Sequence, residues 1–122
     1  MTTTLEQQRA QDAWKCSQGC TSDYRNLAKG LPALIMNSGL MQVMAFLHEK
    51  SDGGSGRKNP HCADLAKQLR HWLSQRFAEI PEPFEDFMQA LMKADSATYQ
   101  AVTAEAYAWL RWVRQMAAAA CP

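Results

Sequence analysis

Apolar residues recur at intervals of three and four positions along most of the chain, and nowhere do they alternate strictly over the length of a strand. This spacing places side chains on one face of an α-helix. The longest such stripe runs from Tyr99 to Met116 over about five turns and predicts a central helix. The pattern therefore predicts an all-α fold, a compact bundle of about five or six helices in a single domain spanning residues 1–122.

Capping residues and prolines indicate where the expected helices begin. Thr4 and Gln7 have the spacing of a capping box, which predicts a helix that begins near Thr4. Asp95 is a suitable N-cap for the last and longest helix. Pro60 and Pro83 are placed to start two further helices, because proline is tolerated in the first turn.

Three places in the first half of the chain leave the number of helices open. Gly19, followed by Ser22 and Asp23, either weakens one continuous helix or separates two. Pro32 either kinks a helix or marks the beginning of a new one, because it cannot donate a backbone hydrogen bond. Gly39 offers either a C-cap or a hinge.

The apolar stripes predict the core. Three tryptophans, Trp14, Trp72 and Trp109, lie on these stripes and are better explained as core than as platforms for base stacking. Trp112 is the aromatic residue expected to be partly exposed and available to a partner. The residues expected to face inward are Ala10, Ala13, Trp14, Ser17, Leu40, Val43, Met44, Leu47, Cys62, Leu65, Ala66, Leu69, Trp72, Leu73, Phe77, Phe84, Phe87, Met88, Leu91, Met92, Tyr99, Val102, Ala106, Trp109, Leu110, Val113 and Met116.

The stretch SDGGSGRKN, residues 51–59, is expected to be a flexible loop. Its three glycines make an ordered backbone costly in entropy. The helix that starts near Leu40 should therefore end before Ser51. Because predicted helices flank the stretch on both sides, we interpret it as a connection within one domain.

Composition and charge are those of a packed domain. The chain is 47% hydrophobic and 20% charged, with a formal net charge of +1, which favours a core over disorder. Polar side chains interrupt every apolar run before the roughly 20 residues that a membrane span needs. The N-terminal residues also lack the basic and apolar layout of a signal peptide. We therefore expect a cytoplasmic protein with no membrane partner.

The four cysteines are expected to be reduced, because disulfides are rare in the cytoplasm. On a continuous helix, Cys16 and Cys20 would place both thiols on one face and could bind a metal with His61 or Cys62. No second pair of ligands has a recognisable spacing. Packing in the core is therefore the favoured explanation, and we expect neither a metal site nor a cofactor.

No catalytic motif is present. The sequence contains no glycine-rich phosphate loop, HExxH or GxSxG. Asp64 and His71 lie seven positions apart on one predicted helix, and the sequence supplies no third partner for them. Because His71 stands beside Lys67 and Arg70, we interpret it as an exposed surface residue. We expect no enzymatic activity.

Charge is unevenly distributed. Residues 1–78 carry ten basic and six acidic side chains, whereas residues 79–95 carry five acidic side chains and one basic. A basic face and an acidic strip, Glu79 to Asp86, can support head-to-tail association of copies. The alternative is that the strip is a solvated loop.

Two groups of basic residues have helical spacing and could follow a phosphate backbone. One lies in the first helical region and shares a face only if that region is one continuous helix. The other lies on the helix after Pro60, and a basic pair in the glycine-rich loop could add contacts without fixed geometry. The alternative is a solvated surface. The candidate RNA-binding residues are Lys15, Arg25, Lys29, Lys67, Arg70, Arg57 and Lys58.

Several blocks in this order and spacing resemble the small subunit of the type III-B CRISPR effector, the Cmr complex. They are residues 9–13, the block YRNLAKGLPALIMNSGLMQVMAFL from Tyr24 to Leu47, LRHWL from Leu69 to Leu73, and the terminal block from Leu91 to Ala117. The resemblance covers almost the whole chain. The terminal block contains Asp95, Tyr99, Thr103, Glu105 and the WLRW core.

The resemblance implies a non-catalytic helical subunit of an antiviral ribonucleoprotein. Copies of it would stack beside the backbone subunits, which hold the CRISPR RNA and cleave target RNA. Its expected partners are the other Cmr subunits, copies of itself, and guide and target RNA, which it would stabilise through basic surface residues. A helical protein-protein adapter without direct RNA contact is the alternative. A DNA-binding regulator is disfavoured, because the candidate recognition helix at residues 38–50 is apolar on most sides.

Overall fold

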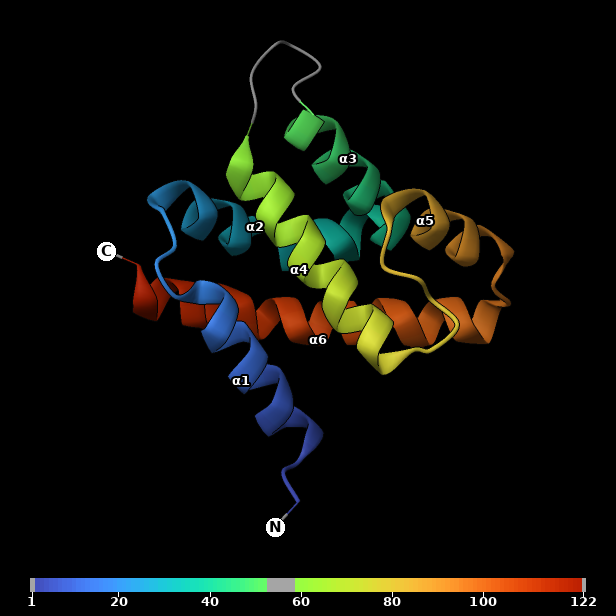
Figure 1. The fold of residues 1–122 in the computed structure, drawn as a ribbon, viewed down its shortest axis with the longest axis horizontal. Helices are drawn as coiled ribbons and strands as arrows, with labels where there is room; N and C mark the ends of the chain where they lie inside the picture. Colours follow the sequence, from blue (N-terminus) through green and yellow to red (C-terminus); the bar gives the residue numbers. More distant parts are fainter. Residues whose placement is uncertain (1, 53–58, 122) are drawn as a thin grey trace.

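The computed structural model describes residues 2–52 and 59–121, and in these ranges the chain forms six helices and no strand. The expected all-α fold is therefore confirmed (Figure 1). Arg57 and Lys58 lie outside the described residues. The helices are α1 (Leu5–Ser17), α2 (Ser22–Ser38), α3 (Leu40–Asp52), α4 (Pro60–Arg76), α5 (Phe84–Lys93) and α6 (Ser96–Ala120).

The local signals fix most helix starts as expected. Thr4 Oγ1 accepts from the Gln7 backbone N–H at 3.1 Å, and the Thr4 N–H donates to Gln7 Oε1 at 2.7 Å, which is the expected capping box. Asp95 Oδ1 accepts from the Thr98 N–H at 2.7 Å and caps α6. Pro60 occupies the first turn of α4.

The first helical region is two helices. Gly19 has a φ of +69°, a conformation that other residues adopt at a steric cost, and the chain turns there before Thr21 caps α2. Lys15 and Arg25 therefore belong to different helices. The expectation of one shared basic face, which required a continuous helix, does not hold.

Pro32 neither starts nor ends a helix, because α2 continues through it to Ser38. Gly39 is the C-cap of α2, with a φ of +85° and an N–H that donates to the Ile35 carbonyl at 2.8 Å. α3 follows at once. It extends to Asp52, past the end expected before Ser51.

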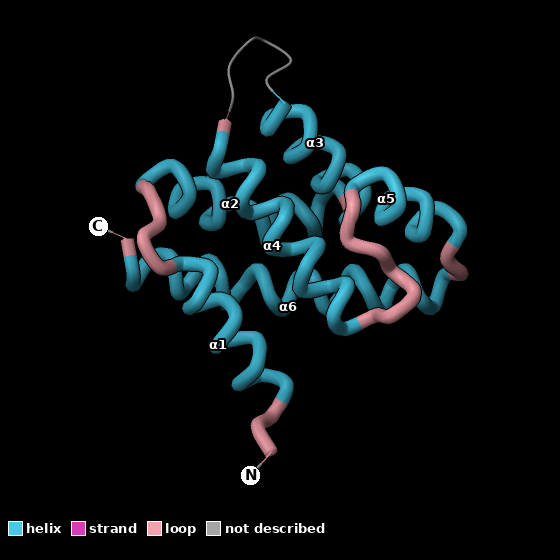
Figure 2. The backbone as a smooth tube through the Cα atoms, viewed as in Figure 1, coloured by secondary structure: helices cyan, strands magenta, loops and turns pink. Residues whose placement is uncertain are grey.

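The core is arranged around α6. Both α1 and α2 pack extensively along α6, and α3 packs mainly on α4 (Figure 1). In the tube view, α6 lies along one side of the molecule and α1 crosses it (Figure 2). Trp109, Leu110 and Val113 are fully buried in this core, as the long apolar stripe of α6 predicted.

Two residues expected in the core lie outside it. Trp14 is 46% exposed and Met92 is 65% exposed. α1 contacts the core through a face centred on Ala13, and Trp14 lies about 100° around the helix from that centre. Met92 is similarly displaced from Leu91, the buried residue beside it on α5. Both differences have the same physical reason, because each side chain lies beside the buried face of its helix and not on it.

Candidate nucleic-acid interface

A buried carboxylate holds α1 and α4 against α6. Glu105, on α6, is only 6% exposed. Its Oε2 accepts from Arg9 Nε at 2.7 Å and from Trp72 Nε1 at 3.0 Å, and its Oε1 accepts from Arg9 Nη2 at 2.8 Å. Burial opposes ionisation of this carboxyl, but the hydrogen bonds from Arg9 and Trp72 and the Arg9 charge outweigh it, so its pKa lies below the ordinary value. The charge of Arg9 is therefore neutralised locally.

A second polar contact, which is partly buried, fixes the rotation of α1. Asp12 Oδ2 accepts from the indole Nε1 of Trp109 at 2.8 Å. The Cys16 thiol donates to the same oxygen at 3.8 Å. Because Arg9 and Asp12 both turn toward α6, the side of α1 that carries Trp14 is left facing solvent. The two contacts thus set how α1 lies against α6.

A basic hollow lies between α2 and α6. It measures about 360 Å³, and Arg25 and Lys29 of α2 face Arg114 of α6 across it. The remaining lining residues are neutral: Asn26, Gln115 and Ala118. Three cations without a carboxylate among the lining residues form a site that suits phosphate oxygens.

A second hollow adjoins the first along α6. It measures about 530 Å³ and lies between α1 and α6, where Arg111 and Trp112 line it. Arg114 and Gln115 line both hollows, so the two hollows adjoin at these side chains on α6. We refer to Arg25, Lys29, Arg111 and Arg114 as the α6 basic surface. Two of these four residues, Arg25 and Lys29, were expected from the sequence.

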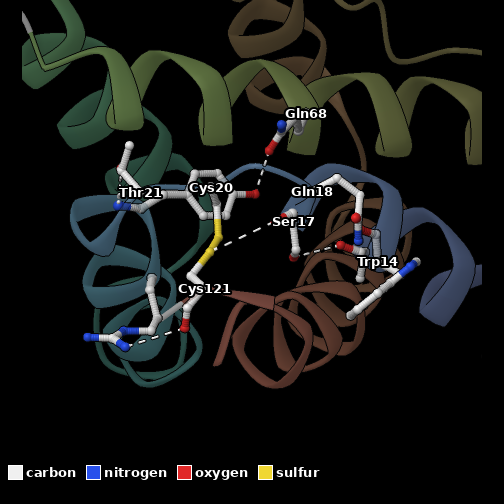
Figure 3. Close-up of a disulfide and its surroundings, with 10 residues drawn as sticks. Trp14, Ser17, Gln18, Cys20, Thr21, Gln68 and Cys121 are labelled. Carbon is white, nitrogen blue, oxygen red and sulfur yellow. Dashed lines mark hydrogen bonds between the residues drawn. A yellow bond between two sulfur atoms is a disulfide. The ribbon is translucent and has the colours of Figure 1, made fainter. Parts of the chain in front are cut away.

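A disulfide ties the end of α6 to the turn before α2. Cys20 and Cys121 are joined, with their Cα atoms 5.8 Å apart (Figure 3). The expectation of four reduced cysteines is therefore wrong for this pair. Arg25 Nη1 donates to the Cys121 carbonyl oxygen at 3.5 Å, so the same corner of the molecule positions a residue of the α6 basic surface.

The disulfide also removes the basis for the Cys16 and Cys20 metal pair. Cys20 lies in the turn beyond α1, and its sulfur is bonded to Cys121. Burial, together with the nearby Asp12 carboxylate, raises the pKa of the Cys16 thiol to about 12. Within residues 2–52 and 59–121, no three His, Cys, Asp or Glu side chains gather as metal ligands would.

The candidates on α4 separate into an exposed lysine and an anchored arginine. Lys67 is exposed. Arg70 Nε donates to the Glu82 carbonyl oxygen at 2.9 Å, and its guanidinium lies 6.0 Å from the centre of the Phe84 ring. Burial lowers the pKa of Arg70, and the Glu82 carboxylate partly offsets this effect. His71 is exposed, as expected, and its Nδ1 lies 3.2 Å from Glu82 Oε2.

Arg70 therefore holds the segment before α5 in place, and an acidic residue stands beside it. Lys15 is exposed near the end of α1 and lines neither hollow.

Sequence reasoning missed Arg111 and Arg114. Their spacing of three on α6, on either side of the partly exposed Trp112, was the available signal.

Comparison with known proteins identifies the family. The family model described as CRISPR-associated protein (Cas_Cmr5) matches residues 5–120. A search of curated proteins gives no match. Among solved structures, the chain is similar to a CRISPR-associated Cmr5 family protein from Thermus thermophilus, with 24% identity, a TM-score of 0.75 and 97% of each chain covered. That similarity shows a shared fold. Among the residues that the structure describes, we find no helix with the length and hydropathy of a membrane span. Because the family model spans nearly the whole chain, this protein belongs to the Cmr5 family, a subunit family of the Cmr complex.

Proposed function

We propose that this chain is a non-catalytic structural subunit of a cytoplasmic type III-B ribonucleoprotein in antiviral defence, and that it stabilises guide-target RNA through the α6 basic surface. The family match supports the place in the Cmr complex. The observation that carries the RNA contact is the hollow where Arg25 and Lys29 meet Arg114 with no carboxylate in its lining. RNA phosphates are the ligand class that this arrangement suits.

The contact is sequence-independent and weak for a single copy. Three phosphate contacts give a salt dependence with a slope of roughly −2 to −3 in log affinity against log salt. When copies stack along one RNA, the binding of one copy raises the effective concentration of RNA at the next. The stack as a whole therefore binds RNA more tightly than a single copy does. Guide and target are recognised through their backbones, and base pairing supplies the sequence specificity.

Stacking of copies is proposed from the distribution of charge. Glu79, Glu85 and Asp86 are exposed on and before α5. Lys15 and Lys67 are exposed outside the α6 basic surface and carry the opposite charge, so that pairing with them leaves the α6 basic surface free for RNA. Two such surfaces on one chain can pair head to tail in an open, repeating contact.

The non-catalytic role rests on the groups that a reaction would need. A thiol with a pKa raised to about 12, as in Cys16, is a poor nucleophile at neutral pH. His71 pairs with Glu82 on the exposed side of α4 and lines none of the hollows described above. The proposal therefore assigns cleavage of target RNA to other subunits.

The residues proposed to contact RNA differ from the sequence-based set. Arg25 and Lys29 are kept, and Arg111 and Arg114 are added. Lys15 and Lys67 remain exposed candidates outside the α6 basic surface, and Arg70 is assigned to holding the segment before α5.

The test compares two triple variants of the subunit in a reconstituted complex. One carries Arg25→Ala, Lys29→Ala and Arg114→Ala. The control removes the same charge from exposed positions elsewhere, with Lys50→Ala, Arg76→Ala and Lys93→Ala. At equal subunit occupancy, we expect the first to weaken target-RNA capture by roughly tenfold or more and the control to change it little.

Equal capture by both triple variants would contradict the proposed RNA contact. The chain would then be an adapter within the complex. An adapter also predicts that association with the other subunits survives complete RNase digestion and raised salt. A pull-down of the tagged protein, analysed by mass spectrometry and RNA sequencing, separates the two functions.

A further inference from the structure

The hollow between α1 and α6 combines groups that phosphate binding alone does not require. Its volume of about 530 Å³ lies in the range of small-molecule sites. Trp112 lines it and is packed against the core, so its ring has little freedom. Arg111 and Gln115 stand on adjacent turns of the same helix, and Glu6 of α1 closes the opposite side.

The cations in this hollow are not equivalent. Arg9 also lines it, but both of its hydrogen bonds go to the buried carboxylate of Glu105. Arg111 lies with its guanidinium carbon 5.8 Å from the centre of the Tyr107 ring and makes no ion pair among the described residues. Arg111 and Arg114 are therefore the charges available to a ligand.

We propose that this hollow is a subsite for one unpaired RNA nucleotide, with its base against Trp112 and its phosphate held by Arg111 and Arg114. Aromatic side chains and guanidinium groups are the usual surfaces for splayed-out bases. The Gln115 amide can donate to and accept from a base edge. Glu6 can accept from a ribose hydroxyl or an exocyclic amine, and its charge repels a second phosphate.

The chemistry favours a nucleotide over an acidic peptide. A carboxylate could pair with Arg111, but it would leave the indole of Trp112 uncovered. A paired base in a duplex cannot reach the indole, because both of its faces are stacked. The occupant is therefore an unpaired position or a single-stranded flank of the RNA.

This inference rests on the proposed function, because the subsite extends the α6 basic surface. Arg114 and Gln115 line both hollows, so a strand whose phosphates contact Arg25 and Lys29 can continue across α6. The first hollow would bind backbone of any kind. The second would distinguish unpaired from paired RNA.

The test uses the purified protein at low ionic strength with a short single-stranded RNA and the same sequence as a blunt duplex. Tryptophan emission reports stacking, and RNA anisotropy reports binding. We expect the single strand to quench emission in the wild type and in Trp14→Phe, which lacks an exposed tryptophan outside the hollow. Trp112→Phe should lose that quenching while it keeps the fold.

Exposed positions supply a second variant that does not depend on the core. Arg111→Ala with Gln115→Ala should weaken single-strand binding by roughly fivefold or more and duplex binding by a clearly smaller factor, because both RNAs lose a phosphate contact and only the single strand also loses the contact to a base edge. Quenching that persists in Trp112→Phe, or equal losses for both RNAs, would overturn the subsite. If the Arg25, Lys29 and Arg114 triple variant still lost binding, the proposed function would stand without the subsite. No binding of either RNA would overturn both.

Discussion

Replacing Glu105 with Gln tests the contact that holds α1 and α4 on α6. The change keeps the size of the side chain and an oxygen for Trp72, but it removes the charge that pairs with Arg9. The side chains of Glu105 and Arg9 are 7% and 21% exposed, and Arg9 makes two short hydrogen bonds to the carboxylate. Breaking a buried pair costs about 3–5 kcal/mol, and because Arg9 keeps some access to water we expect about 2–3 kcal/mol.

Urea unfolding followed by far-UV circular dichroism measures this loss. Glu49→Gln is the matched control, because Glu49 is exposed on α3 and should change the free energy of unfolding by less than about 0.5 kcal/mol. The double variant with Arg9→Gln should recover part of the loss, since the unpaired cation is then removed. If Glu105→Gln and Glu49→Gln have the same free energy of unfolding, the ion pair between Glu105 and Arg9 does not stabilise the bundle.

The same contact predicts a dependence on pH. The pKa of Glu105 is lower in the folded protein than in the unfolded chain, so its contribution is fully present above the unfolded pKa. It is lost as pH falls through the folded pKa. The difference in stability between the wild type and Glu105→Gln should therefore be constant above about pH 6 and shrink steadily in acid. A difference that grows in acid would contradict the depressed pKa.

Three local features of the bundle should each contribute to its stability. The Cys20–Cys121 disulfide links residues 101 positions apart. Its reduction, or the substitution Cys121→Ser, should lower the free energy of unfolding by about 2–5 kcal/mol. Equal melting temperatures with and without dithiothreitol would contradict this. Arg70→Ala should cost about 1 kcal/mol in urea unfolding, because it removes the bond to the segment before α5, while Lys67→Ala should cost almost nothing. Gly39→Ala should cost about 1–3 kcal/mol, because Gly39 combines a φ of +85° with a ψ of 161°, a conformation that almost only glycine adopts, and an unchanged melting temperature would argue against that C-cap geometry.

Local and periodic signals were sufficient for the helices and for most of the core. Thr4 and Asp95 cap helices through bonds to backbone groups three residues away, and such contacts are fixed by neighbouring sequence. The stripe on α6 is long enough for its period to be unambiguous. The buried Trp109 and Leu110 follow from it directly.

Contacts between distant residues account for what the sequence did not reveal. Trp14 faces solvent because polar residues of α1 turn toward Glu105 and Trp109, more than 90 positions away. The pairing of Cys20 with Cys121 likewise depends on where α6 ends in space. Arg114 joins Arg25 only because α2 and α6 lie side by side. Helical spacing within a single helix could not predict these contacts between different helices.

The proposed function requires that the α6 basic surface contacts RNA in the assembled complex. The most direct measurement is photo-cross-linking of a complex reconstituted with guide RNA and a 4-thiouridine-labelled target, followed by mass spectrometry of the cross-linked peptides. We expect cross-links in this subunit at residues 25–29 of α2 and 111–115 of α6. Cross-links confined to the face of α4 around Lys67, or none in this subunit while its neighbours are labelled, would contradict it.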